Sequence, residues 1–316
     1  MVVASLSLTS CSSNGVDTPI GPATAPSATP VPEARTEVAA ARLGDQILVI
    51  GGLVADGSAT DRVDRYDTKT GRWSDGPAMP EPLHHAGAAA FGGRLFVAGG
   101  YVVGPTSAWS ETDRVWSLGP ADAAWKAEPA LGNRRGALGL AATTSRLVAF
   151  GGTSDGQVVD TVEVYRAGMD GWRPAPPMSM AREHTAAATV GGRVYAIAGR
   201  SGGLDTNLVA VESFDPAAFN GGWRNEPALA VPRGGMAAAT VGDTICVAGG
   251  EAPTGTIASV ECLRNGAWRN HGDLSEARHG VGVVAGDDGR LHVLAGGPQP
   301  GLFVSTAHEI LQIPEI

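Results

Sequence analysis

The stretch Thr189-Val190-Gly191-Gly192-Arg193-Val194-Tyr195-Ala196-Ile197-Ala198-Gly199 recurs in variant form along the chain. It joins a Gly-Gly turn to an apolar run that ends in another glycine. A fixed period of several tens of residues predicts a fold built from one repeated unit. Glycines that end the apolar run mark six units, about 50 residues apart, at Gly51, Gly99, Gly151, Gly199, Gly249 and Gly296.

A tryptophan follows the glycine in five of the six units. These residues are Trp73, Trp125, Trp172, Trp223 and Trp268. Between glycine and tryptophan lies a short alternating segment, such as Val162-Glu163-Val164-Tyr165. Alternation of apolar and polar side chains indicates a β-strand with one buried face. The chain therefore predicts six similar small sheets and no long helix.

The order of glycine pair, aromatic residue and tryptophan resembles the kelch repeat, whose family fold is a β-propeller. The resemblance covers residues 34–316 and implies an all-β, six-bladed kelch-type propeller with four-stranded antiparallel blades. Three units depart from the pattern: the second has Leu118 for the aromatic, the fourth has Arg200 for the second glycine, and the sixth lacks the tryptophan. The expected blades are approximately 34–82, 83–132, 133–180, 181–230, 231–276 and 277–316.

The fourth unit shows how one blade is expected to divide into strands: 185–190, 193–198, 209–214 and a last strand from Trp223. First strands are rich in alanine, because six inner strands converge on the axis. Tyr66, Tyr165, Phe214 and the tryptophans are expected to pack between blades. The sixth unit is too short for a fourth strand, so residues 27–33 are expected to close that blade, prolines being acceptable at a sheet edge.

The first eleven residues form an apolar, small-residue run that ends in Leu8-Thr9-Ser10-Cys11. This ending resembles a bacterial lipobox, which implies a signal segment over 1–11 and a lipid on Cys11. No Lys or Arg precedes the run, so we expect the true start to lie upstream. Residues 12–33, rich in Ser, Pro, Ala and Thr, are expected to form a flexible tether. The alternative is a disordered cytosolic N-terminus.

Charge and composition exclude some classes of function. The chain has 23 basic and 32 acidic side chains, a net charge of −9. It therefore lacks the basic surface of a nucleic-acid-binding protein. Contact with a membrane is expected only through the lipid, which implies an extracytoplasmic, envelope-anchored protein. We expect one propeller domain and a monomer.

The resemblance also implies where a ligand would bind. Kelch domains that bind ligands commonly use one mouth of the central channel, through residues that enter the first strand and follow the glycine pair. The positions carried over are Arg35, Glu37, His85, Tyr101, Arg135, Arg182, His184, Arg200, Arg233, Glu251 and Arg278. Arginines at such a mouth favour a carboxylated sugar or an acidic peptide. The alternative for the five repeated arginines is that they brace neighbouring blades through backbone carbonyls.

No catalytic, metal or cofactor site is predicted. His84-His85 and Glu183-His184 are adjacent pairs, and neighbours on a strand point to opposite faces, so neither pair is expected to act together. Phosphate-binding and nucleophile motifs are absent from the sequence. No cofactor is therefore expected, and catalysis is unsupported by any motif.

Two cysteines lie in the predicted fifth blade. A pairing of its second and third strands that is symmetric about residue 254 would place Cys246 opposite Cys262, within reach of a disulfide. Export would favour the oxidised form.

Two readings of function stand. The favoured one is a binding or scaffolding module for a glycan or a protein, because the segments between repeats are short. The other is a carbohydrate-active enzyme resembling the bacterial kelch sialic-acid epimerases and mutarotases, with Arg182, His184, Arg200 and Glu251 in the site. A copper radical oxidase is rejected, because the ligands and extra domains are lacking.

Overall fold

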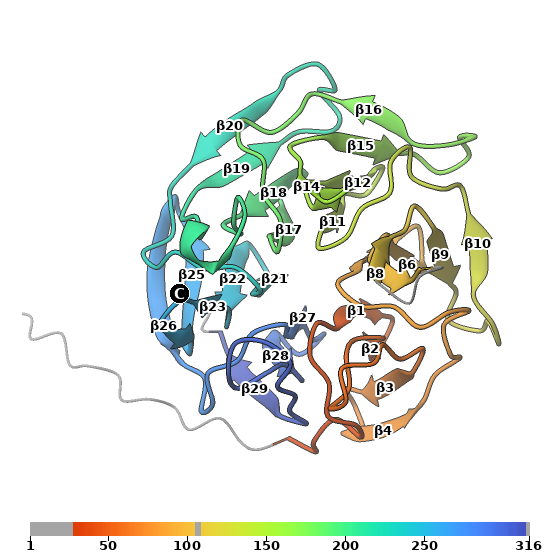
Figure 1. Ribbon diagram of the computed structural model, residues 1–316, viewed down its shortest axis with the longest axis vertical. Helices are drawn as coiled ribbons and strands as arrows, with labels where there is room; N and C mark the ends of the chain where they lie inside the picture. Colours follow the sequence, from red (N-terminus) through yellow and green to blue (C-terminus); the bar gives the residue numbers. More distant parts are fainter. Residues whose placement is uncertain (1–27, 105–108, 314–316) are drawn as a thin grey trace, which may run out of the picture.

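A computed structural model describes residues 28–104 and 109–313. Six antiparallel sheets stand as blades around a central axis (Figure 1), which confirms the predicted six-bladed propeller. Outside the blades, the described residues form three two-stranded hairpins, the short 3-10 helix η1 (Leu204–Thr206), and turns and loops. No helix among them is long and apolar enough to cross a membrane.

Five blades have four strands each. Blade one contains β1 Ala39–Leu43, β2 Gln46–Ile50, β3 Val63–Asp67 and β4 Arg72–Asp75. Blade two contains β5 Gly87–Phe91, β6 Arg94–Ala98, β9 Val115–Leu118 and β10 Lys126–Glu128. Blade three contains β11 Gly139–Ala142, β12 Leu147–Phe150, β15 Val162–Tyr165 and β16 Arg173–Ala175.

The remaining blades follow the same order from the axis outward. Blade four contains β17 Ala186–Val190, β18 Arg193–Ile197, β19 Val211–Phe214 and β20 Trp223–Glu226, close to the strands expected from the sequence. Blade five contains β21 Ala237–Val241, β22 Thr244–Ala248, β25 Ser259–Arg264 and β26 Ala267–Asp273. Blade six has three strands, β27 Gly282–Ala285, β28 Arg290–Leu294 and β29 His308–Gln312.

Short additions connect the second and third strands of three blades. They are the hairpins β7–β8 (Tyr101–Val103 and Trp109–Glu111), β13–β14 (Thr153–Ser154 and Gln157–Val158) and β23–β24 (Glu251–Ala252 and Gly255–Thr256). Since strand direction alternates, all three lie at the end of the propeller where the first strands begin. We call this end the mouth face.

Packing between blades uses small residues near the axis and aromatic pairs further out. The inner strands contact one another in sequence, and β1 contacts β27, so the ring is closed at its centre. Phe150 of blade three and Trp223 of blade four have ring centroids 5.5 Å apart, and Phe91 of blade two and Tyr165 of blade three have centroids 6.4 Å apart. Aromatic rings therefore fill the wider space that the diverging blades leave, as the sequence predicts.

Each of the five repeat tryptophans also joins its blade to the preceding one. The indole N–H of Trp125 donates to the carbonyl of Pro77, 2.9 Å away. Trp172, Trp223 and Trp268 make the same bond to Pro129, Pro176 and Pro227. Trp73 donates to the carbonyl of Thr29 at 2.9 Å. Thr29 thus takes, for the sixth blade, the place that a proline takes in four others.

The N-terminal segment closes the ring without forming a strand. It lies beside β29 (Figure 1), and the Val31 amide donates to the carbonyl of Thr306 at 2.9 Å. Val31 is fully buried, as are the residues at the same position of the other blades, Met79, Leu131, Met178, Leu229 and Leu274. The predicted strand is corrected for residues 28–33, because Pro30 and Pro32 remove every second amide donor from this stretch. Residue 27, Cys11 and the expected signal and tether lie outside the described residues.

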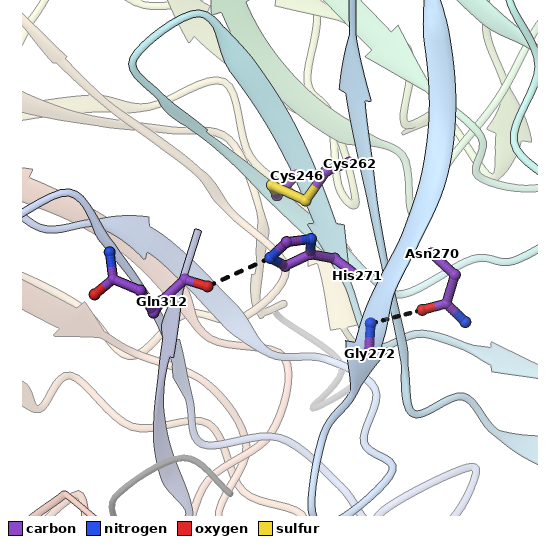
Figure 2. The surroundings of a disulfide bond; sticks show 6 residues. All are labelled: Cys246, Cys262, Asn270, His271, Gly272 and Gln312. Atoms are coloured by element: carbon purple, nitrogen blue, oxygen red, sulfur yellow. Dashed lines mark hydrogen bonds between the residues drawn. A yellow bond between two sulfur atoms is a disulfide. The ribbon is translucent and has the colours of Figure 1, made fainter. Parts of the chain in front are cut away.

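A disulfide joins the second and third strands of blade five. Cys246 on β22 faces Cys262 on β25, with Cα atoms 4.1 Å apart, in the register expected from the sequence. Figure 2 shows His271 of β26 beside this bond, reaching Gln312 of β29, whose carbonyl lies 3.3 Å from Nε2. The disulfide therefore fixes the sheet that contacts the last blade.

Candidate functional site

Five arginines stand before the inner strands, and all are completely buried: Arg35, Arg135, Arg182, Arg233 and Arg278. Arg135 donates to the carbonyls of Gly151 and Thr161, each 3.0 Å away, and to Glu163 at 2.8 Å. These acceptors belong to its own blade. The Arg135 carbonyl accepts from Gly100 of the preceding blade. Arg35, Arg182 and Arg233 follow the same pattern, whereas Arg278 bonds Glu309 and the carbonyl of Glu276.

The arginines are braces and do not face a ligand. None of them lines the axial cavity. Their placement in a ligand-binding mouth is therefore corrected, because each guanidinium is already enclosed by carbonyls and a carboxylate. The alternative that these arginines brace the blades therefore fits their position. The observed bracing differs in one respect: each side chain bonds within its own blade, and the backbone carbonyl bonds to the neighbouring blade.

Two residues after each brace position, six residues form a ring around the axis. We call this ring the collar: Glu37, His85, Ala137, His184, Gly235 and Gly280. All six have positive φ, between 48° and 67°. Amide N–H groups of successive members donate to the carbonyl of the previous one, and the amide of Val38 completes the ring through Gly280. The collar is therefore a closed circle of backbone hydrogen bonds that fixes its side chains in place.

The collar has three large and three small residues. Glu37, His85 and His184 are large, whereas the other three positions hold alanine or glycine. The imidazoles of His85 and His184 meet across Ala137, with ring centroids 4.7 Å apart. Six large side chains could not converge on one axis, so the small residues make room for the three functional ones. Below them lies a cavity of about 130 Å³, lined mainly by small and aliphatic residues of the inner strands.

A network of charged groups surrounds the collar. Arg200 donates from Nε to Glu183 at 2.6 Å and from Nη1 to Glu251 at 3.0 Å. Glu183 also contacts His184 Nδ1 through its other carboxylate oxygen. On the opposite side, His279 Nδ1 lies 3.0 Å from Glu37 Oε1 and 3.6 Å from Glu251 Oε2.

Adjacent residues cooperate here, contrary to the expectation from strand geometry. Glu183 and His184 are in contact, and the Nδ1 atoms of His84 and His85 lie 2.5 Å apart. The alternation of strand side chains fails because the collar residue has a positive φ, which turns it toward the side of its predecessor. The reasoning that set both pairs aside is thus corrected.

Aromatic groups border the network at blade two. Tyr101 bonds Thr153 through its hydroxyl, 2.5 Å away, and its ring lies over Gly136, where a β-carbon would come within 2.3 Å of it. The ring of His84 stacks on Tyr101 and touches Trp109 of the hairpin β7–β8, with centroids 4.3 Å apart. Trp109 is 46% exposed, so it offers an open aromatic face next to the collar.

Burial governs the ionisation of His84 and His85. It lowers the pKa of His85 well below its ordinary value and that of His84 to about 4. Burial also opposes the charge of Glu37, but the imidazoles of His85 and His279 outweigh it and hold the pKa of Glu37 below its ordinary value. His279 shows the converse: burial opposes its charge, but the Glu37 carboxylate, 3.0 Å from its Nδ1, raises its pKa.

The charge of this site does not suit a carboxylated ligand. Three buried carboxylates, of Glu37, Glu183 and Glu251, face one guanidinium, that of Arg200. Arg200 already uses two of its nitrogens on these carboxylates. Bidentate capture of a sugar acid or an acidic peptide, which the arginine pattern suggested, is therefore disfavoured by the geometry.

Sequence reasoning found part of this site and missed part. Glu37, His85, Tyr101, His184, Arg200 and Glu251 were carried over correctly to the mouth face. Glu183, His279 and His84 were missed as members, although they occupy one repeat position, directly after the brace. That column pairs with the residue after each glycine pair, as in the bridge between Glu183 and Arg200. A comparison of the residues at this position across the six repeats would have indicated that Glu183, His279 and His84 belong to the site. From the sequence we assigned Arg200 to the second glycine of its pair, but Ala198 and Gly199 have the positive φ values of that pair, so Arg200 is the residue that follows it.

The collar also groups metal-binding side chains. Among the described residues, Glu37, His85 and His184 each offer one ligand atom within 4.8 Å of the other two. From the sequence we expected no metal site, because the one candidate was the adjacent pair His84-His85, whose side chains were expected to point to opposite faces of a strand. The observed set comes instead from blades one, two and four.

Comparison with known proteins shows which fold and which sequence motif this chain shares with them. The family described as the Kelch motif matches residues 34–80 and 134–179. The solved structure of YjhT superposes with a TM-score of 0.79 at 16% identity, covering 91% of this chain and 97% of that one. A likeness at this identity concerns the fold alone, and that fold is the β-propeller of six radial sheets.

Curated relatives agree. Kelch-like protein terF of Aspergillus terreus (strain NIH 2624 / FGSC A1156) is 27% identical over 300 residues, 89% of this chain and 65% of that protein. Kelch-like protein 33 of Homo sapiens is 31% identical over 169 residues, 53% of this chain and 31% of that protein. The Kelch motif matches and these relatives support a kelch-repeat family for this chain. The chain spans less than two thirds of the length of these relatives.

Proposed function

We propose that this chain is a binding module that takes a glycan at its mouth face, above the collar. The observation that carries the proposal is the pairing of an exposed aromatic ring with a fixed polar network. Trp109 is open to solvent and leans on His84, and the collar below it is held by a ring of backbone bonds. Sugar rings combine an apolar face with hydroxyl groups, so an aromatic platform next to carboxylates and imidazoles suits them.

The charge of the network limits the classes of glycan that fit the site. Because carboxylates outnumber the guanidinium, a neutral or amino-substituted sugar fits better than a sialylated one. A panel of neutral, amino and sialylated oligosaccharides, screened by thermal shift and followed by calorimetry, tests this. Binding of a neutral or amino sugar supports the proposal, and binding of sialylated sugars alone contradicts it.

Two variants locate the binding surface. Trp109→Ala is expected to weaken the binding of a calorimetrically detected glycan by about 2- to 10-fold, since aromatic contacts contribute on the order of 0.5–1.5 kcal/mol. Phe219→Ala is the matched control, because Phe219 is also an exposed aromatic residue but lies between β19 and β20, at the opposite end of the propeller. Equal affinity of both variants would contradict a site at the mouth.

A protein ligand is the other outcome of this test. Leu302 and Phe303 are exposed on the loop between β28 and β29, which rises at the same face, and Val103 is exposed on the hairpin β7–β8. Absence of glycan binding, together with binding of a protein that Leu302→Asp abolishes, would favour this reading over the glycan.

The contact between Glu183 and His184 favours a second candidate, a carbohydrate-active enzyme resembling the kelch sialic-acid epimerases and mutarotases. A carboxylate that holds an imidazole can support proton transfer, and Arg200 orients the carboxylate. Arg182, also named for that role, is buried beneath the site. Anomer exchange measured by NMR on any sugar that binds would reveal the activity, and loss of exchange with retained binding in His184→Gln would assign it.

We also propose that the protein is exported and anchored through a lipid on Cys11. The disulfide between Cys246 and Cys262 supports export, because such bonds persist in oxidising compartments. Expression in a bacterial host, followed by fractionation and mass spectrometry of the N-terminus, tests the proposal. Cys11→Ser is expected to move the protein from the membrane fraction to the soluble fraction. An unmodified Cys11 in cytosolic protein would contradict it.

A further inference from the structure

We propose that Glu37, His85 and His184 bind a divalent first-row metal ion of the zinc class at the centre of the collar. Two imidazoles and one carboxylate form a donor set that such ions prefer. The inference goes beyond glycan binding and does not depend on it.

The distances suit a small ion. The possible ligand atoms of the three residues lie within 4.8 Å of one another, and His85 Nε2 is 3.1 Å from Glu37 Oε2. Ligands of a tetrahedral zinc ion, at bond lengths of about 2.0–2.1 Å, stand about 3.3 Å apart. One pair therefore already has the required separation, and the ligand atom of His184 lies within 4.8 Å of both.

Each of the three residues is held by a neighbour that occupies its other polar atom. Glu183 contacts Nδ1 of His184, and His84 contacts Nδ1 of His85, so Nε2 is the nitrogen left for an ion in both rings. His279 holds Oε1 of Glu37, which leaves Oε2. Metal-binding histidines characteristically have their second nitrogen fixed in this way, most often by a carboxylate.

The charge around the collar is not balanced by the protein. Glu37, Glu183 and Glu251 carry three carboxylates, and Arg200 supplies one positive charge. Even with His279 protonated, one negative charge remains. A buried carboxylate is costly unless paired, so a divalent cation between Glu37 and the two imidazoles would stabilise the cluster.

Space remains for a further ligand on the ion. The side chains of Glu37, His85 and His184 are each about one tenth exposed, with values of 10%, 11% and 12%. The collar positions on the far side, Gly235 and Gly280, have no side chain. A bound ion would thus keep an open position toward the mouth, where water or a donor atom of a ligand could bind.

Calorimetric titration of the purified, chelator-treated protein with Zn²⁺ tests the inference without any sugar. We expect one ion per chain with a Kd of about 1 μM or tighter, and a Co²⁺ absorption spectrum typical of nitrogen and oxygen ligands. Mg²⁺ is expected not to compete, since it prefers oxygen ligands. Absence of binding in this folded protein, or equal affinity for Mg²⁺, would overturn the inference.

Variants assign the ligands. His85→Ala and His184→Ala are each expected to weaken Zn²⁺ binding by about 100-fold or more, and Glu183→Gln by about 10- to 100-fold through loss of orientation. His271→Ala is the matched control, because His271 is an exposed histidine on the outer strand of blade five. Unchanged affinity in both collar variants, each shown to be folded by circular dichroism, would refute the assignment, as would equal loss in the control. A negative sugar panel would leave these results unaffected.

Discussion

Leu83 and Trp116 occupy, in blade two, the positions that hold a buried arginine and a buried carboxylate in the other five blades. The five pairs are Arg35–Asp64, Arg135–Glu163, Arg182–Glu212, Arg233–Glu261 and Arg278–Glu309. Blade two lacks both the arginine and the carboxylate. Loss of one alone would leave a buried charge without its partner, which is far costlier than an apolar pair of suitable size.

This relationship predicts a non-additive pair of substitutions in blade three. Arg135→Leu and Glu163→Leu are each expected to lower the free energy of unfolding by about 3–5 kcal/mol, because each leaves the other charge buried. The double variant is expected to lose less than the sum, as two positions in contact are coupled. Urea unfolding of the four proteins measures the coupling. Strict additivity would show that the two charges do not depend on each other.

Val31 is expected to be essential to ring closure. Val31→Ala removes two methyl groups from a fully buried position and should lower the free energy of unfolding by about 2 kcal/mol. Val103→Ala makes the same chemical change at a residue that is 61% exposed, and should change it by less than about 0.5 kcal/mol. The denaturant midpoints of the two variants, compared with that of the unmodified protein, measure this difference. Similar values would mean that residues 28–34 do not complete the propeller.

The collar glycine Gly280 is expected to tolerate no side chain. Its φ is 60°, and a β-carbon would lie 2.4 Å from Thr36 Oγ1 and 2.6 Å from the Glu37 amide nitrogen. Gly92 has nearly the same φ, 58°, with no atom within 4 Å of such a carbon. Gly92→Ala should therefore cost about 1–2 kcal/mol for backbone strain alone, and Gly280→Ala clearly more. Thermal denaturation of both gives the comparison. Equal melting temperatures would argue against a tightly closed collar.

Acid is expected to destabilise the junction of the last blade and the N-terminal segment. His308 Nδ1 donates to the Thr29 carbonyl at 3.1 Å, and its Nε2 lies 2.9 Å from His292 Nδ1. Burial lowers the pKa of each to about 4, whereas a histidine in the unfolded chain titrates near 6.5.

The sign follows from proton uptake. Below pH 6.5 the unfolded chain binds protons that the folded chain does not, so the free energy of unfolding is highest above pH 6.5 and falls toward pH 4. The upper limit is about 1.4 kcal/mol per pH unit for each histidine. Urea unfolding at pH 7, 6 and 5 measures the slope, which should be shallower in the double variant His292→Gln, His308→Gln. An unchanged slope would place the acid sensitivity elsewhere, for instance at His84.

Much of the fold could be predicted because the repeat is local. The glycine after each apolar run, the alternating third strand and the tryptophan each report on neighbours within one blade. The same reasoning predicted that Cys246 faces Cys262, since a hairpin register depends on its own two strands. It placed a strand over residues 27–33 because the sixth blade lacked one, whereas residues 28–33 use single hydrogen bonds and the Val31 side chain instead.

The site was harder, because it depends on which residues face one another across the axis. His85 and His184 are separated by a whole blade, and they meet only because Ala137 between them is small. Glu183 reaches His184 only because the backbone there leaves strand geometry. A column of arginines pointed to an anion-binding mouth, but whether a cation faces solvent or a carboxylate is decided by the third strand of its own blade.

The sequence by itself determined the repeat, the number of blades and the order of strands within each, because these follow from short-range turns, alternation and aromatic spacing. Only the tertiary structure decided that the arginines lie inside the blades, that residues 29–35 complete the ring, and that Glu37, His85 and His184 converge at its centre. Closing the ring brings six distant segments to one axis, and the space and charge available there depend on all six at once.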